Sequence, residues 1–128
     1  MKLTFTWEKI SGDIDPFCES SDKNEDGISL LACLLMDDGG RRYIETLSWV
    51  HDGILKVDSV TRGYLSNSDW DREAWGAKVD GNEVKIYSLH NEYYCELVAV
   101  STFRMALEAW ANFIQSAPDM AVKKEISL

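Results

Sequence analysis

Apolar and polar residues alternate at the start of the chain. In residues 2–7, KLTFTW, every second residue is large and apolar, which predicts a strand with one buried face. Residues 8–27 are polar and rich in turn-forming residues, so they predict a long connection. Residues 28–36 form a continuous apolar run between turn signals, which predicts a central buried strand.

The middle of the chain carries several turn signals. Asp-Asp-Gly-Gly at 37–40 predicts a hairpin, because glycine adopts positive φ easily, and residues 41–50 predict the returning strand. Another turn is expected at 51–53. The apolar spacing in residues 54–65 is less regular and fits a strand or, alternatively, a short helix. Residues 66–75 predict a loop or a single helical turn.

The C-terminal part has the clearest patterns. An Asp-Gly pair within residues 76–89 separates two β-prone runs and predicts a hairpin, and residues 93–100 predict a further strand. Residues 101–117 predict an amphipathic helix with Ser101 as its N-cap, and Pro118 ends it. The apolar face of this helix consists of Phe103, Leu107, Trp110 and Ile114.

These elements predict an α+β domain. We expect an antiparallel sheet of about five to six strands, with the C-terminal amphipathic helix packed on one face. A chain of this length typically forms one domain, which we place at residues 1–118. Residues 119–128 are expected to be a C-terminal tail.

The net charge of the chain favours some classes of binding partner over others. The chain has 22 acidic and 13 basic residues, a formal net charge of −9, which repels nucleic acid and anionic lipid and favours a basic protein. The start of the chain lacks the apolar segment of a signal peptide, and the apolar run at 30–36 is too short to cross a bilayer. We therefore expect a cytoplasmic protein that binds neither nucleic acid nor membrane.

Residues 22–27 resemble the start of a calcium-binding loop. Asp22, Asn24 and Asp26 fall on loop positions 1, 3 and 5, and Gly27 falls on position 6. Position 12, where a bidentate glutamate is needed, is Cys33, and no helix is predicted before the loop. The sequence therefore favours an acidic turn that leads into a buried strand, and no metal site is expected.

Two acidic segments are candidate contact sites for a basic partner. The first lies within residues 13–26 and comprises Asp13, Asp15, Glu19, Asp22, Glu25 and Asp26. The second combines acids with a tryptophan, a residue type favoured in interface hot spots, and comprises Asp69, Trp70, Asp71 and Glu73. Each segment has a simpler interpretation, a solvated acidic loop in the first case and buried indoles in the second. Tyr93 and Tyr94 should point to opposite faces of their strand, leaving one exposed.

Catalytic residues are not evident. His51 and His90 lie in no recognised catalytic spacing, and Gly39-Gly40 lacks the Lys-Ser/Thr that completes a phosphate-binding loop. The three cysteines show no Cys-x-x-Cys spacing, which favours neither a zinc site nor a disulfide framework. We therefore expect no catalytic residues, no cofactor and no enzymatic activity.

The C-terminal half, DGNEVKIYSLHNEYYCELVAVSTFRMALEAWANFI, resembles bacterial immunity proteins of polymorphic-toxin and contact-dependent growth inhibition systems. The resemblance covers residues 80–114 and consists of a hairpin, a strand and a helix with the pattern F-x-x-A-L-x-A-W-x-x-F-I. It implies a single-domain cytosolic inhibitor that binds one cognate toxin domain, often a nuclease, and blocks its active site or the approach of its substrate. A nuclease is commonly basic, which suits an acidic inhibitor. The alternatives are an acidic nucleic-acid mimic that inhibits a DNA- or RNA-binding protein, and a small enzyme.

Overall fold

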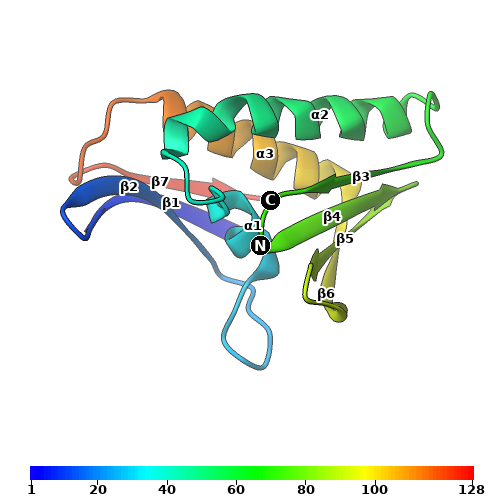
Figure 1. Cartoon of the computed structure of the whole chain (residues 1–128), viewed down its shortest axis with the longest axis horizontal. Coiled ribbons are helices and arrows are strands. Elements are labelled where there is room, and N and C mark those ends of the chain that lie inside the picture. Colours follow the sequence, from blue (N-terminus) through cyan, green and yellow to red (C-terminus); the bar gives the residue numbers. More distant parts are fainter.

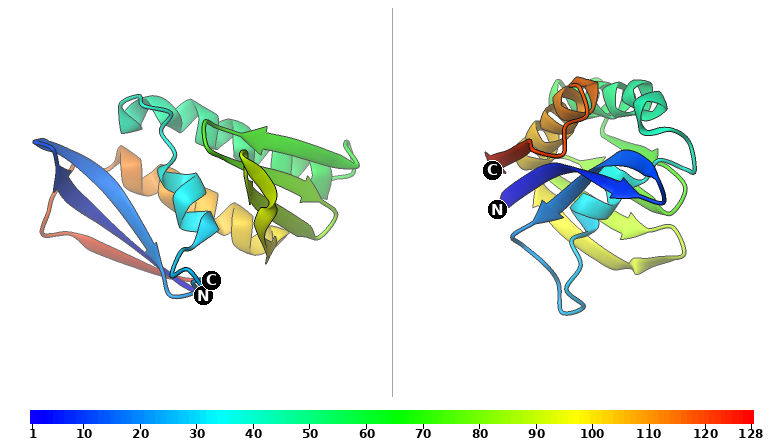
Figure 2. Two further views of the ribbon diagram at one scale, coloured as in Figure 1. Left: turned by 60° about the horizontal axis from the view of Figure 1, so that its bottom comes forward. Right: turned by 90° about the vertical axis from the view of Figure 1, so that its left-hand side faces the viewer.

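Seven β-strands form two antiparallel sheets, and the helices pack against both (Figures 1 and 2). The structure is a computed structural model that describes residues 1–128. Sheet A has the strand order β2-β1-β7 and sheet B the order β3-β4-β5-β6. The strands of sheet A are β1 (Lys2–Ile10), β2 (Asp13–Ser20) and β7 (Lys123–Ser127). Those of sheet B are β3 (Asn67–Asp71), β4 (Trp75–Asp80), β5 (Glu83–Ser88) and β6 (Asn91–Ala99).

Three α-helices and one short 3-10 helix complete the fold. They are α1 (Leu30–Met36), η1 (Tyr43–Thr46), α2 (Leu47–Thr61) and α3 (Val100–Gln115). Helices α2 and α3 pack side by side and form a layer along one side of the two sheets, whereas α1 lies between the sheets (Figures 1 and 2). The predicted α+β class and the C-terminal helix are confirmed, although the strands form two sheets and not one. No helix is long and apolar enough to cross a membrane.

Two groups of aromatic side chains form the centre of the core. Under sheet A, Trp7 stacks on Phe113 of α3 with ring centroids 4.9 Å apart, and Phe5 meets Trp110 edge-on. Under sheet B, Trp70 of β3 stacks on Trp49 of α2 at 4.1 Å and donates a hydrogen bond from Nε1 to the Trp49 carbonyl, 3.0 Å away. These contacts fix α3 against sheet A and α2 against sheet B.

Several predicted strands are in fact helical. The run at 28–36 was expected to be a strand, but residues 30–36 form α1, capped by the Ser29 side chain, which accepts a hydrogen bond from the Ala32 N–H. Helix α1 is buried between two sheets, so its apolar residues show no helical periodicity in the sequence. The expected hairpin at 37–40 and returning strand at 41–50 were also wrong. Those residues form a loop, η1 and the start of α2, and the helical alternative for 54–65 is the one observed.

Two strands were missed because their sequences are polar. Residues 13–20, predicted as part of a connection, form β2, and residues 67–71, predicted as a loop or helical turn, form β3. Both are edge strands, and side chains of neighbouring helices form hydrogen bonds with their backbone groups. Lys56 Nζ and Trp49 Nε1 of α2 donate hydrogen bonds to the Asp69 and Asp71 carbonyls of β3, each at 2.9 Å. Tertiary contacts therefore compensate for weak strand propensity.

The hairpin, strand and helix predicted in the C-terminal part of the chain are confirmed. The hairpin at Asp80-Gly81, the strand at 93–100 and the helix at 101–117 all exist, with bounds shifted by one or two residues. The N-cap of α3 is Ala99 and not Ser101, and it makes no side-chain capping bond. Residues 119–128, expected to be a tail, contain β7, which pairs antiparallel with β1.

Helix α1 is attached to sheet B at both of its ends and to sheet A through its last residue. At its N-terminus, Glu96 of β6 accepts a hydrogen bond from the Leu31 N–H at 2.6 Å. At its C-terminus, Asp37 Oδ2 accepts hydrogen bonds from the N–H groups of residues 73–75, at the end of the connection from β3 and the start of β4, at 2.9–3.2 Å. On the side of sheet A, the Sδ of Met36 accepts a hydrogen bond from the Cys18 N–H.

Gly53 leaves the space that the buried indole of Trp70 occupies. A Cβ at Gly53 would lie 2.6 Å from Cε2 of Trp70, closer than atoms can approach without movement. We expect Gly53→Ala to lower the free energy of unfolding by about 1–3 kcal/mol through overpacking, although alanine favours helix by about 1 kcal/mol. Urea denaturation measures this. The control His51→Ala, at an exposed position of α2, should change stability by less than about 0.5 kcal/mol. A stabilised G53A protein would contradict the packing described here.

Asp37 holds the connection between β3 and β4 against α1. We expect Asp37→Ala to lower the free energy of unfolding by about 1–3 kcal/mol, because three backbone N–H groups lose their acceptor. Asp38→Ala is the matched control, since Asp38 Oδ1 accepts a single hydrogen bond from the exposed Gly40 N–H. Urea denaturation of the two variants should show the larger loss for Asp37, and equal losses would contradict this role.

Candidate protein-interaction surfaces

The structure separates the predicted contact residues into different surfaces. Asp13, Asp15 and Glu19 lie on β2 and point away from the core, because the buried positions of this strand are Pro16, Cys18 and Ser20. Asp22, Glu25 and Asp26 lie at the other end of β2, in the exposed loop 21–28. A strand of eight residues is about 26 Å long, so residues 13–26 do not form one acidic cluster.

The residues of the second predicted segment also lie in different environments. Trp70 is buried, so it packs in the core as the simpler interpretation held, and it is not exposed to a partner. Asp69 and Asp71 flank it on β3 and point to the opposite, outer face of sheet B. Glu73 lies in the exposed turn between β3 and β4. Of this segment, Asp69, Asp71 and Glu73 are therefore the accessible residues.

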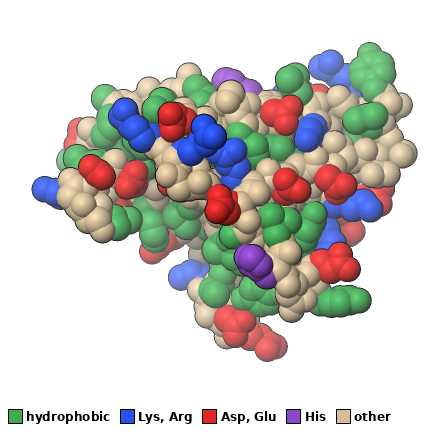
Figure 3. All heavy atoms as spheres, in the orientation of Figure 1, with side chains coloured by type: hydrophobic (Ala, Val, Ile, Leu, Met, Phe, Trp, Pro, Cys, Tyr) green, Lys and Arg blue, Asp and Glu red, His purple; other side chains and the backbone are tan.

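The loop 21–28 is tied to sheet B. The Asn24 side-chain oxygen accepts hydrogen bonds from the N–H groups of Asp26 and Ile28, which closes the turn at Gly27. The Tyr94 hydroxyl of β6 accepts a hydrogen bond from the Asn24 amide and donates one to the Asp26 carboxylate, at 2.8 and 3.0 Å. Two residues that matched the calcium pattern are thus engaged in holding the loop. Figure 3 shows acidic side chains at the lower tip of the molecule, where this loop lies in Figure 1.

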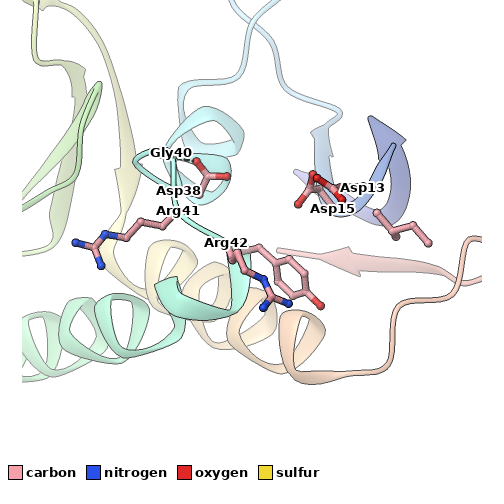
Figure 4. Close-up of a pocket in the computed structure, with 8 residues that line it drawn as sticks. Asp13, Asp15, Asp38, Gly40, Arg41 and Arg42 are labelled. Carbon is pink, nitrogen blue, oxygen red and sulfur yellow. Dashed lines mark hydrogen bonds between the residues drawn. The ribbon is translucent and has the colours of Figure 1, made fainter. Parts of the chain in front are cut away.

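A hollow of about 500 Å³ lies between β2 and the loop that follows α1 (Figure 4). Asp13 and Asp15 approach it from β2, and Asp38, Arg41 and Arg42 approach it from the other side. The two arginines form no ion pair with these carboxylates, and the side chain of Arg41 extends away from Asp13 and Asp15 (Figure 4). This hollow has mixed charge and contains no arrangement of a nucleophile with a base.

The outer face of sheet B is uncovered, since all three α-helices pack on the other side (Figure 2). Cross-strand pairing brings Asp71, Gly76, Tyr87 and Cys95 into one row across the four strands. The next row consists of Asp69, Lys78, Lys85 and Leu97. Sequence reasoning missed this surface as a unit, because its residues come from four strands, one of which was predicted as a loop.

Large apolar side chains are exposed on this outer face. Tyr93 is 87% exposed and Leu97 is 60% exposed, both on β6. Tyr94, next to Tyr93, is half-buried on the inner side, so the prediction that one tyrosine is exposed is confirmed. Burial, together with Asp69 and Asp71, raises the pKa of Tyr87. The Tyr87 hydroxyl therefore stays protonated and can donate a hydrogen bond at neutral pH.

The remaining titratable side chains are dispersed. His51 is exposed on α2 and His90 is exposed in the turn between β5 and β6. Burial raises the pKa of the Cys18 thiol to about 12, and it also raises the pKa of Cys33. Both thiols are thus held in their protonated, weakly nucleophilic form. The third cysteine, Cys95, is exposed on the outer face of sheet B.

Comparisons with protein families, curated proteins and solved structures gave no match for this chain. The case for function therefore depends on the chemistry and placement of its own residues.

The Glu96 carboxylate at the N-terminus of α1 should make stability depend on pH. Burial raises the pKa of Glu96, so its contribution to stability is greatest at low pH and falls as pH rises through that pKa. Glu96→Gln keeps an oxygen acceptor for the Leu31 N–H but carries no charge. We expect the stability of E96Q relative to the unmodified protein to increase from about pH 4 to about pH 7 in urea denaturation. A pH-independent E96Q difference would contradict the prediction.

Proposed function

We propose that this chain is a cytoplasmic immunity protein that binds and neutralises a cognate toxin domain, most naturally a basic nuclease. The observation that carries the proposal is the number of free carboxylates. Of 22 acidic side chains, four form ion pairs within the chain. These four are Asp52, Asp58, Glu108 and Glu125. Asp37 and Glu96 accept backbone hydrogen bonds within the fold, and most of the other carboxylates are exposed and available to a cationic partner.

The placement of the acids supports protein binding. Exposed carboxylates lie on β2, in the loop 21–28 and on the outer face of sheet B. A nuclease must attract an anionic substrate, so an acidic inhibitor competes for the same positive surface and associates rapidly. Inhibition then requires contact alone, with carboxylates lying where phosphates would bind.

An acidic nucleic-acid mimic is the second candidate, favoured by sheet A. Glu8 of β1 and Asp15 of β2 are directly opposite each other, and both side chains point outward. Asp13 and Glu19 extend this stripe along β2. Like charges opposite each other are unfavourable in a sheet, so a stripe of this kind suggests a role outside folding. Such a protein would inhibit a DNA- or RNA-binding protein.

Neutralisation of an encoded toxin tests the proposal. The proposal predicts a gene for a large secreted protein next to the gene for this chain, and the probe is the C-terminal domain of that protein. We expect an equimolar amount of the chain to abolish the toxic activity of that domain. Affinity measured by calorimetry should fall by about tenfold or more between about 0.05 and 0.5 M salt, because charge pairs contribute to binding.

Two outcomes would decide against an immunity protein. If the toxin domain remains active with excess chain, the chain is not its inhibitor. If the chain instead binds an unrelated DNA-binding protein, such as a restriction enzyme, and competes with duplex DNA for it, the mimic is correct. A charge-matched acidic protein of similar size serves as the control for non-specific attraction.

A further inference from the structure

We propose that the outer face of sheet B is the surface on which the basic partner docks, with an Arg- or Lys-bearing segment of that partner lying across β5 and β6. This inference rests on the proposed function and assigns the contact surface within it. It also moves the principal contact away from most of the acidic residues that the sequence suggested.

The edge of this face formed by β6 is apolar and exposed. Tyr93 and Leu97 of β6 present more than half of their surface to solvent, and Leu89 adds a further exposed side chain after β5. Contiguous exposed apolar side chains on a sheet are typical of interaction sites. Aromatic residues are favoured at the centre of such sites, because they bury a large area with few rotatable bonds.

Tyr87 is already ordered before any partner binds. A Cβ at Gly76 would lie 3.0 Å from the Tyr87 ring and 3.1 Å from Leu89, so the absence of a side chain at Gly76 lets both residues lie flat on β4. Lys85 Nζ lies 5.6 Å from the centre of the Tyr87 ring on the same face. A side chain held in place by its neighbours loses little entropy on binding.

Carboxylates on the same face as this apolar edge define the chemistry of the partner. Asp69, Asp71 and Glu92 lie close enough to Tyr87 to raise its pKa. A partner guanidinium group that displaces Lys85 from the Tyr87 ring can stack on this ring while it forms paired hydrogen bonds with a neighbouring carboxylate. The edge of β3 and the surface of Tyr87 together offer both interactions, which favours arginine in the partner.

A second copy of this chain fits the face less well. The outer positions of β3, β4 and β5 carry four acids and two lysines, so two such faces would repel each other. The acids are Asp69, Asp71, Asp80 and Glu83, and the lysines are Lys78 and Lys85. Charge complementarity therefore selects a basic protein.

The size of the face shows where the partner must extend. Four strands make a face about 19 Å wide and about 20 Å long, roughly 400 Å² in area, which is smaller than the roughly 800 Å² that a stable complex buries on each partner. The nearest acidic extension is the loop 21–28, which Tyr94 ties to β6. Because Tyr94 lies on the inner side of β6, the partner must extend around the edge of β6 to contact Asp22 and Glu25 of this loop.

Chemical protection of Cys95 tests the docking surface on the unmodified protein. Cys95 is the exposed cysteine of the chain and lies in the row that contains Tyr87. The probe is the neighbouring toxin domain, inactivated at its catalytic residue, and the readout is the rate of alkylation by a maleimide. We expect about a tenfold or greater decrease in this rate with saturating toxin, because the bound partner covers the thiol. A thiol introduced by Leu55→Cys, 64% exposed on α2 in the free protein, should react equally fast with and without toxin.

Matched variants measure the contribution of the apolar edge formed by β6. Tyr93→Ala combined with Leu97→Ser should weaken toxin binding by about 100-fold, the effect typical of hot-spot residues. The control combines Tyr64→Ala and Leu55→Ser, which remove the same side-chain types from positions that are 76% and 64% exposed elsewhere. This control should bind within about threefold of the unmodified protein, and thermal unfolding checks that both double variants remain folded.

The outcomes separate the surface from the function. If the unmodified protein neutralises the toxin while Cys95 stays reactive and the Tyr93/Leu97 variant binds normally, the docking surface is wrong and the proposed function stands. If the unmodified protein does not bind the toxin, both are overturned. If sedimentation shows a dimer that the Tyr93/Leu97 variant abolishes, the occupant is a second copy, and the proposed basic partner is wrong.

Discussion

The attachment of α1 at both ends is the interaction on which the arrangement of the two sheets depends. This helix of seven residues is too short to be stable alone, and its leucines are buried because sheets lie on both sides of it. Carboxylates from Glu96 and Asp37 accept backbone N–H groups at its two ends and join it to sheet B. The adjacent Met36 contacts sheet A. Without these contacts, the sheets would share only the layer formed by α2 and α3.

Local sequence patterns correctly predicted the elements that bury only one face. The hairpin at Asp80-Gly81 and the helix α3 have one buried face each, so their periodicity and turn residues are visible in the sequence. Helix α1 is surrounded by apolar neighbours, so its sequence is a continuous apolar run without helical periodicity. Edge strand β3 is polar, and its existence depends on hydrogen bonds from Trp49 and Lys56 of α2, which no local pattern contains.

The surface was less predictable than the fold, because residues distant in sequence meet on it. The search for acidic segments identified the loop 21–28 and the acids of β3. It also selected Trp70 as a contact residue, but Trp70 is buried against Trp49. The exposed apolar side chains of β6 became significant only once the sheet showed that they share a face with Tyr87 and Asp71. The proposed basic partner was suggested by composition, whereas the face on which we propose that it binds became visible only in the topology of sheet B.

The pairing of β7 with β1 has a consequence for the order of folding. Residues 2–6 align with residues 123–127, so this ladder closes a loop of more than one hundred residues. Each strand of sheet B, in contrast, pairs with the next strand in the chain. Because long-range contacts form more slowly than local ones, we expect the hairpins of sheet B to form early and sheet A to be completed late. The surface proposed for docking would then be among the first parts of the molecule to take shape.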